Sequence, residues 1–276
     1  MCLIAFEWRP DRSFGRRLTL AANRDEFFHR ETLPLRPWAE RDDILAGADL
    51  GADRGADGLP GTWLGVTRAG RFAALTNVRG SGEKQPRSTS RGHLVSAFLA
   101  GRMPAAEYLL EVQARAQRYN GFNLLLGQLT GAQPQIWSYS NRGEQAPERL
   151  KPGIYGVSNA ALDTPWPKLT RTLARFTVEL AGSIETRPLA PKLFTLLADT
   201  ELTPDDKLPQ TGVSLDWERA LSAVFIRGEQ YGTRSSQVLT VMADGQTDYR
   251  ERRFGPLGEA QKRSTSDSVW QFAATE

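Results

Sequence analysis

The residues best suited to nucleophilic chemistry stand at the start of this chain. Cys2 is the only cysteine among 276 residues, and it directly follows Met1. Methionine aminopeptidase readily removes Met before a small residue, and the α-amine freed on Cys2 would have a pKa of about 8. That amine can accept the thiol proton, so Cys2 alone would supply both a nucleophile and its base. The alternative is that Cys2 is a small apolar residue of a buried strand.

The polar tetrad NRDE at 23–26 is expected to lie beside Cys2. The segments on either side of residues 9–15 alternate with period two, which is typical of strands. Residues 9–15 contain Pro, Asp, Ser and Gly, which favour a turn. If the two strands pair antiparallel across this turn, opposing residue numbers sum to about 25–27. Cys2 would then lie beside one of the first three residues of the tetrad.

The same alternation assigns faces to the tetrad. Asn23 and Asp25 point to one side of the strand, and Arg24 and Glu26 point to the other. We expect the carboxylate of Asp25 to hold the ammonium or the thiol of Cys2 in place. For Arg24 and Glu26 we favour a buried ion pair that stabilises the strand over a catalytic role. Asn23 is expected to support the site or its substrate.

Bulk composition indicates a soluble globular protein. Apolar residues make up 40% and charged residues 24% of the chain. The 35 basic and 32 acidic residues leave a net charge of only +3, so we expect neither nucleic acid nor membrane insertion. A single cysteine permits no internal disulfide and fits the reducing cytoplasm. The expected partner is a small-molecule ligand or substrate, with no metal and no required cofactor.

The remaining segments predict a mixed α+β fold. Strands are expected at 62–80 (a hairpin), 122–129, 135–140, 153–159 and 231–254 (a hairpin), and helices at 91–101, 104–119, 165–182 and 191–199, with Ser90 and Thr164 as caps. Residues 27–38, which are punctuated by Pro, and residues 47–58, which repeat Gly-Ala-Asp three times, are expected to form loops. The alternative for that repeat, a calcium site, lacks the EF-hand spacing. The blocks of strands and helices, with no evident linker, favour one layered domain spanning 1–276.

Several motifs together resemble the NRDE family, which includes the transport and Golgi organisation proteins of eukaryotes. They are the initial MC, the tetrad NRDE, and the segments GTWLGVTRAGRFAALTNVR, YGVSNAALDTPWPK and YGTRSSQVLTV, and the likeness extends to about residue 254. The family is similar to the N-terminal-nucleophile (Ntn) hydrolases. This resemblance implies a four-layer αββα sandwich with two antiparallel sheets, and the cysteine amidases of that superfamily imply an amidohydrolase.

The resemblance also implies roles for single residues. Cys2 matches the nucleophile and Asp25 the carboxylate near its amine. Asn77 and Asn159 match asparagines that donate to an oxyanion, and Arg234 matches a late basic residue that closes the site. Without the resemblance, the asparagines would be turn residues at strand ends and Arg234 a member of a structural ion pair. Many bile-salt hydrolases carry Arg where this chain has Ala22, so their substrate class is not carried over.

A second function implied by the resemblance is binding. Members of the family are associated with haem trafficking and with acyl-CoA or lipid ligands, so the same cleft would hold such a ligand without catalysis. Candidate axial ligands for haem are Cys2, His29 and His93, although neither histidine lies in a haem motif, and a surface or capping histidine is the simpler interpretation of each. A third possibility is a scaffold whose ancestral site is inactive.

Overall fold

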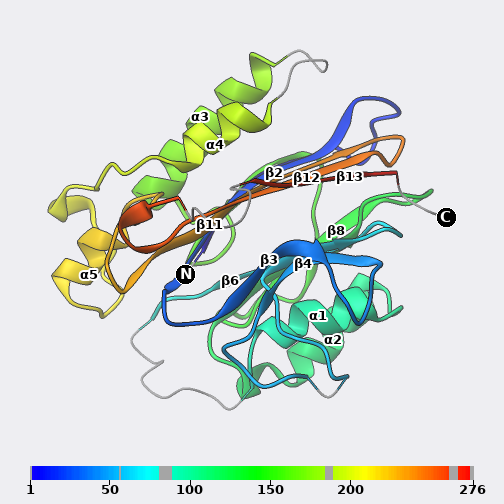
Figure 1. Cartoon of the computed structure of the whole chain (residues 1–276), viewed down its shortest axis with the longest axis horizontal. Coiled ribbons are helices and arrows are strands. Elements are labelled where there is room, and N and C mark those ends of the chain that lie inside the picture. Colours follow the sequence, from blue (N-terminus) through cyan, green and yellow to red (C-terminus); the bar gives the residue numbers. More distant parts are fainter. Residues whose placement is uncertain (1, 56, 81–88, 184–188, 261–266, 274–276) are drawn as a thin grey trace.

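Two antiparallel sheets stacked face to face form the centre of the molecule. The computed structural model describes residues 2–55, 57–80, 89–183, 189–260 and 267–273. Within these residues, one sheet has six strands and the other has seven. We call them sheet A and sheet B. Figure 1 shows the two sheets lying between helices, which confirms the predicted αββα layers.

Sheet A contains the strand that begins with Cys2. Its strands, in spatial order, are β10 (Gly153–Val157), β1 (Cys2–Trp8), β2 (Arg16–Phe27), β11 (Tyr231–Met242), β12 (Thr247–Arg253) and β13 (Asp267–Phe272). Strands β1 and β2 form the predicted hairpin, and Cys2 pairs with Arg24, so the residue numbers sum to 26. The pairing therefore confirms the expected register.

Sheet B follows the order of the sequence. Its strands are β3 (Thr32–Pro37), β4 (Ile44–Asp49), β5 (Leu64–Thr67), β6 (Arg71–Asn77), β7 (Phe122–Gln128), β8 (Gln135–Ser140) and β9 (Glu148–Arg149). Each strand pairs antiparallel with its neighbour in the sequence. Such a meander needs only short connections between most of its strands.

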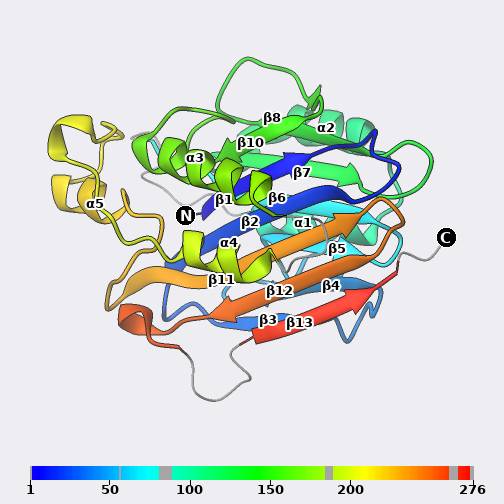
Figure 2. The same cartoon turned by 90° about the horizontal axis from the view of Figure 1, so that it is seen from above.

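A helical layer covers the outer face of each sheet. Helices α3 (Pro167–Ala181) and α4 (Ala190–Leu197) pack on sheet A, whereas α1 (Gly92–Ala100) and α2 (Ala105–Ala114) pack on sheet B. A shorter helix, α5 (Leu215–Ala220), lies to one side of the sheets (Figure 2). No helix in the described part of the chain is both long enough and apolar enough to cross a membrane.

The alternation of side chains along β1 divides its residues between two apolar cores. Ile4, Phe6 and Trp8 belong to the core between the sheets. Leu3 and Ala5 belong instead to the core between sheet A and helices α3 and α4. All residues of β1 are buried, because both faces of the strand are covered. The strand that carries Cys2 is therefore held rigidly from both sides.

Some expectations about local structure were wrong. Residues 32–37 form strand β3 although they were expected to be a loop, and strand β4 includes residues 47–49, the start of the expected Gly-Ala-Asp loop. They pair with each other and, through β4, with β5, so tertiary pairing overrides the effect of their prolines and glycines. The N-cap residues of α1 and α3 are Arg91 and Trp166, each downstream of the predicted cap. Residues 81–88 of the polar loop at 79–92 lie outside the described residues.

Candidate active site

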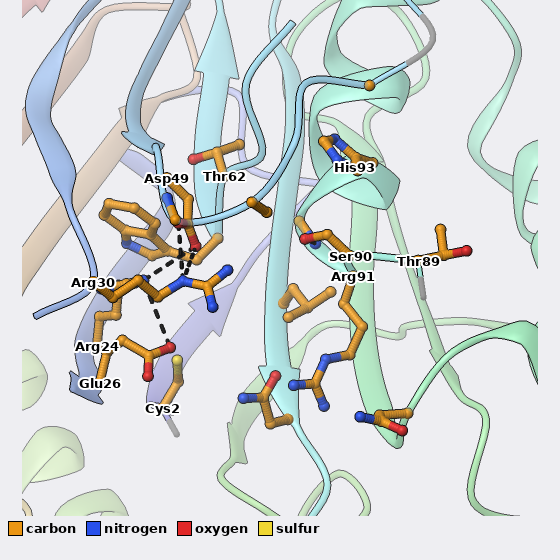
Figure 3. Close-up of a pocket in the computed structure, with 18 of the residues that line it drawn as sticks. Cys2, Arg24, Glu26, Arg30, Asp49, Thr62, Thr89, Ser90, Arg91 and His93 are labelled. Carbon is orange, nitrogen blue, oxygen red and sulfur yellow. Dashed lines mark hydrogen bonds and ion pairs between the residues drawn. The ribbon is translucent and has the colours of Figure 1, made fainter. Parts of the chain in front are cut away.

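Cys2 lies on the wall of a cleft of about 650 Å³. The cleft opens where the N-terminal end of β1 meets sheet B and the start of α1. Figure 3 shows Cys2, Arg24 and Glu26 on one side and Thr89, Ser90, Arg91 and His93 on the other. Clefts of this size commonly bind small molecules. The thiol is thus placed where a ligand can reach it.

The Cys2 side chain faces the second sheet together with Arg24. Directly opposed residues of an antiparallel ladder present their side chains on the same face, and Cys2 is opposed to Arg24. Cys2 is only 8% exposed. Burial raises the pKa of its thiol, the nearby Asp25 adds to that effect, and Arg24 opposes it. The thiol is consequently protonated at rest, and nucleophilic attack requires a base.

Asp25 points to the opposite face of the same strand. It is opposed to Thr233 of β11, whose Oγ1 donates to Asp25 Oδ1 at 2.7 Å. The same Oγ1 accepts a hydrogen bond from the backbone N–H of Ile226, so the hydroxyl proton of Thr233 points towards Asp25. Burial raises the pKa of Asp25, while Lys168 and the Thr233 hydrogen bond lower it. The structure thus places a buried carboxyl group next to Arg24, the residue opposite Cys2, and Asp25 also lines the cleft.

Arg24 and Glu26 form the predicted pair on the cleft side. Arg24 Nη2 lies 3.8 Å from Glu26 Oε2 and 3.4 Å from Asp49 Oδ2. The guanidinium also stacks on the ring of Trp63 at 4.3 Å from its centroid. Arg30 binds the same Asp49 carboxylate at 2.9 Å. This network, drawn in Figure 3, makes the wall around Cys2 rigid and charged.

Asn23 is a structural residue of the helical side of sheet A. Its Nδ2 donates to the carbonyl oxygens of Leu197 and Val224, both at 2.8 Å, and its Oδ1 accepts from Ser236 Oγ. It is 1% exposed and bonds to the last residue of α4 and to the segment that follows α5. Asn23 therefore supports the site by joining sheet A to its helical layer.

The two predicted oxyanion donors occupy different positions. Asn77, the last residue of β6, lines the cleft with Cys2. Asn159 is fully buried, and its Nδ2 donates to the backbone oxygen of Asn77 at 2.9 Å. The backbone oxygen of Asn159 accepts the N–H of Arg79, so two strand ends are joined here. Asn159 thus fixes the backbone of Asn77 at the end of β6.

Arg234 makes contacts with backbone groups. Its Nη1 donates to the carbonyl oxygens of Phe27 and Arg30 at 2.7 and 2.9 Å. Burial lowers its pKa to about 10, and the neighbouring Arg24 and Arg253 contribute. The interactions of Arg234 hold the connection between β2 and β3, from which Arg30 extends into the cleft.

The two histidines are far from equivalent. His93, in the first turn of α1, lines the cleft. His29 instead stacks against Phe27 with ring centroids 5.4 Å apart. No group of three or more His, Cys, Asp or Glu side chains in the described ranges has the geometry of a metal site.

Sequence reasoning missed Lys168 as a residue of the site. It lies in the first turn of α3, is 3% exposed, and donates from Nζ to Leu221 O at 2.8 Å. Burial lowers its pKa to about 8, and the charges of Asp25, Arg79, Cys2 and Glu218 act on it. Lys168 ends the motif YGVSNAALDTPWPK, which is the only signal in the sequence that points to it.

The sequence matches a known family over nearly its whole length. The model of the family described as Transport and Golgi organisation 2 matches residues 1–256. The chain belongs to this family. Its membership confirms the resemblance carried by the initial MC, the NRDE tetrad and the later motifs.

Animal members of the family align with this chain over almost the whole length of both proteins. The Bos taurus Transport and Golgi organization protein 2 homolog is 39% identical over 266 residues, covering 91% of this chain and 92% of that protein. The Homo sapiens homolog is 37% identical over 264 residues with the same coverage. The Drosophila melanogaster Transport and Golgi organization protein 2 is 29% identical over 282 residues, covering 95% and 96%.

Among solved structures, a similar one is a mutant of the conjugated bile acid hydrolase of Clostridium perfringens. The similarity has a TM-score of 0.49 and 8% sequence identity, and it covers 99% of this chain and 92% of that one.

Proposed function

We propose that this family member is a cysteine amidohydrolase of the Ntn type that acts on a small amide or related acyl substrate. One observation carries the proposal: Cys2, at the start of its strand, lines a cleft together with Asn77 and the buried Asp25, which follows the residue opposite Cys2 in the ladder. The lone thiol must stay reduced to act, so the proposal includes a cytoplasmic location.

The reaction begins with a proton transfer inside Cys2. Once Met1 is removed, the α-amine takes the thiol proton as the sulfur attacks the substrate carbonyl carbon. The resulting ammonium then protonates the leaving nitrogen as the C–N bond breaks, which leaves a thioester on Cys2. Water, deprotonated by the same amine, attacks the thioester and releases the acid and the free thiol. Asp25 orients the amine throughout.

The oxyanion formed in each step needs donors on the cleft wall. Asn77 supplies a side-chain amide there, and Asn159 fixes Asn77 through the bond to its backbone oxygen. Removal of one such donor costs about 3 kcal/mol of transition-state stabilisation. Arg234 acts at a distance, because it fixes the β2–β3 connection that bears Arg30. Asn159 and Arg234 therefore position other groups of the site and do not touch the substrate themselves.

The first test determines whether Cys2 has a free amine and an activated thiol. Intact mass of the protein from its native cells shows whether Met1 is removed, and 2-cyanobenzothiazole reacts with an N-terminal cysteine only when both groups are free. Alkylation of Cys2 by iodoacetamide should be faster than that of a model cysteine peptide at the same pH. Retained Met1, or an alkylation rate equal to the peptide's, overturns the mechanism.

The second test measures turnover directly. The processed protein is incubated with p-nitroanilides of acetic, hexanoic and phenylacetic acids, and nitroaniline release is followed with a mass search for the thioester on Cys2. We expect release to be abolished in Cys2→Ala and lowered at least about 100-fold in Asn77→Ala. Release that persists in Cys2→Ala would show that another group does the chemistry.

Binding of haem without catalysis is the second candidate function, because Cys2 and His93 both line the cleft. The cleft wall is mostly polar, with Trp63 and Leu75 as its large apolar side chains, which suits the ionic edge of a haem better than its apolar face. Titration with haem should then give a saturable Soret shift that is lost in Cys2→Ala or His93→Ala. A shift that survives both variants, or no shift, rejects this candidate. The same cleft is the proposed site for an acyl-CoA or lipid ligand.

A further inference from the structure

Lys168 is a buried cation that the mechanism above does not use. It is 3% exposed and stands in the first turn of α3, where the positive end of the helix dipole repels an ammonium. Both burial and this position destabilise its charged form. A buried lysine in such a place is costly for the fold, and its surroundings must explain it.

Four ionisable groups that act on Lys168 come from separate parts of the fold. They are Asp25 of β2, Cys2 of β1, Glu218 of α5, and Arg79, which follows β6. Arg79 and Glu218 form an ion pair, with Arg79 Nη1 3.2 Å from Glu218 Oε2. Glu218 also accepts the backbone N–H and the hydroxyl of Thr211. Of the two acidic side chains, Asp25 favours the charged form of Lys168 more strongly than Glu218 does.

Asp25 is also the group that acts on the amine of Cys2 in the proposed mechanism. A carboxylate beside an amine stabilises the ammonium form, and an ammonium cannot accept the thiol proton. A second cation on the same carboxylate weakens that effect. The buried Lys168 stands on α3, which packs on the helical face of sheet A where Asp25 also lies, while the thiol of Cys2 is on the cleft side.

We propose that Lys168 is a positioning residue of the Cys2 centre, whose ammonium offsets the charge of Asp25 and so keeps the α-amine of processed Cys2 available as a base. The inference rests on the proposed function and adds a second residue to its proton-transfer apparatus. The hydrogen bond from Lys168 Nζ to Leu221 O, at the C-terminal end of α5, holds the ammonium in this place. The lowered pKa of Lys168 agrees with its crowded position and with an ammonium near neutral pH.

The test is the pH dependence of Cys2 alkylation by iodoacetamide, measured by intact mass on the processed full chain. In Lys168→Met the charge of Asp25 is no longer offset by Lys168, so Asp25 stabilises the α-ammonium more strongly. The midpoint of the alkylation profile should therefore move up by about one pH unit. At a pH below that midpoint, alkylation should be about tenfold slower than in the wild type. Lys168→Arg retains the charge and should restore the profile.

The matched control is Lys192→Met on α4, because Lys192 is half exposed and pairs with Glu179 on the surface of the same helical layer. Its profile should overlay that of the wild type. A Lys168→Met profile that also overlays the wild type overturns the role of Lys168, even when wild-type Cys2 is activated. If wild-type Cys2 reacts no faster than a model peptide, the proposed function itself fails.

If Lys168 had only a structural role, Lys168→Met would lower the stability of the fold without moving the pH profile of alkylation. Circular dichroism therefore accompanies each measurement. If Lys168→Met does not fold, Asp25→Asn provides the same test from the other partner. It removes the carboxylate that Lys168 offsets, and the midpoint should fall. An unchanged midpoint in folded Asp25→Asn would also overturn the inference.

Discussion

Each side chain of the tetrad at 23–26 has its own set of partners, although the four residues are consecutive. Asn23 bonds to carbonyl groups beneath the helical layer, and Asp25 bonds to Thr233 on that same face. Arg24 and Glu26 lie on the cleft side with Asp49. On the helical face the tetrad makes hydrogen bonds that hold the layers together, and on the cleft face it contributes charged side chains. One short motif serves both purposes because its residues alternate.

At the residue scale, Asn23→Ala should destabilise the fold strongly. The substitution leaves the buried carbonyl groups of Leu197 and Val224 without this donor and Ser236 Oγ without its acceptor. We expect a loss of about 2–4 kcal/mol in the free energy of unfolding, measured by urea denaturation. Gln246→Ala, at an exposed turn position, is the control and should change stability by less than about 0.5 kcal/mol. A similarly small loss for Asn23→Ala would contradict the structural role.

At the scale of elements, close approach between layers depends on a small residue in β5. A Cβ on Gly65 would lie 2.7 Å from Leu99 Cδ1 of α1 and 2.8 Å from the Cβ of Ala46 in β4. Gly65→Ala should therefore push α1 away from sheet B and cost about 1–3 kcal/mol in thermal or urea unfolding. Gly143→Ala, where nothing lies within 4 Å of the added Cβ, is the control. Equal stability of the two variants would show that α1 adjusts freely.

The sequence was sufficient for the elements whose patterns are local. The alternation of β1 and β2 with a turn between them predicted the hairpin, and the sum rule limited the partner of Cys2 to residues 23–25, of which the structure has Arg24. Strands β3, β4 and β13 escaped prediction, because their pairing partners, rather than their own residues, make them strands. Local propensity is weak in such segments.

The site was predictable only in part for the same reason. Cys2, Asp25 and Asn77 were found from the hairpin and the family motifs, and all three line the cleft although Asn77 is far from the other two in the sequence. The bond from Asn159 to the backbone of Asn77, and the burial of Lys168, arise from contacts between layers. Spacing along the chain does not encode such contacts.

At the scale of the whole molecule, a buried carboxyl group joins the two sheets. Glu251 of β12 accepts the backbone N–H of Leu35 in β3 at 2.7 Å and Gln237 Nε2 at 2.8 Å. Burial raises its pKa above the ordinary 4.5, although these hydrogen bonds oppose the shift. A carboxyl group with a raised pKa in the folded state stabilises the fold at low pH and loses that contribution as pH rises through its folded-state pKa.

Replacement of this group should change how stability depends on pH. Gln at position 251 stays neutral, so the stability of Glu251→Gln relative to the wild type should increase between pH 5 and pH 8. Urea denaturation at both pH values measures the difference. The exposed Glu144→Gln is the control, with a difference that is constant across this range. A constant difference for Glu251→Gln as well would mean that the two sheets are joined without a titrating group.

The order of strands has a consequence for biosynthesis. Sheet B is complete once the ribosome has made residue 149, because its strands are consecutive, whereas β2 receives its second partner only when β11 is translated. Until then the nascent amino terminus belongs to an unfinished half of the protein. In the finished fold, the side chain of Cys2 is 8% exposed. We therefore expect an aminopeptidase to have its best access during translation, before β10 and β11 pair with β1 and β2.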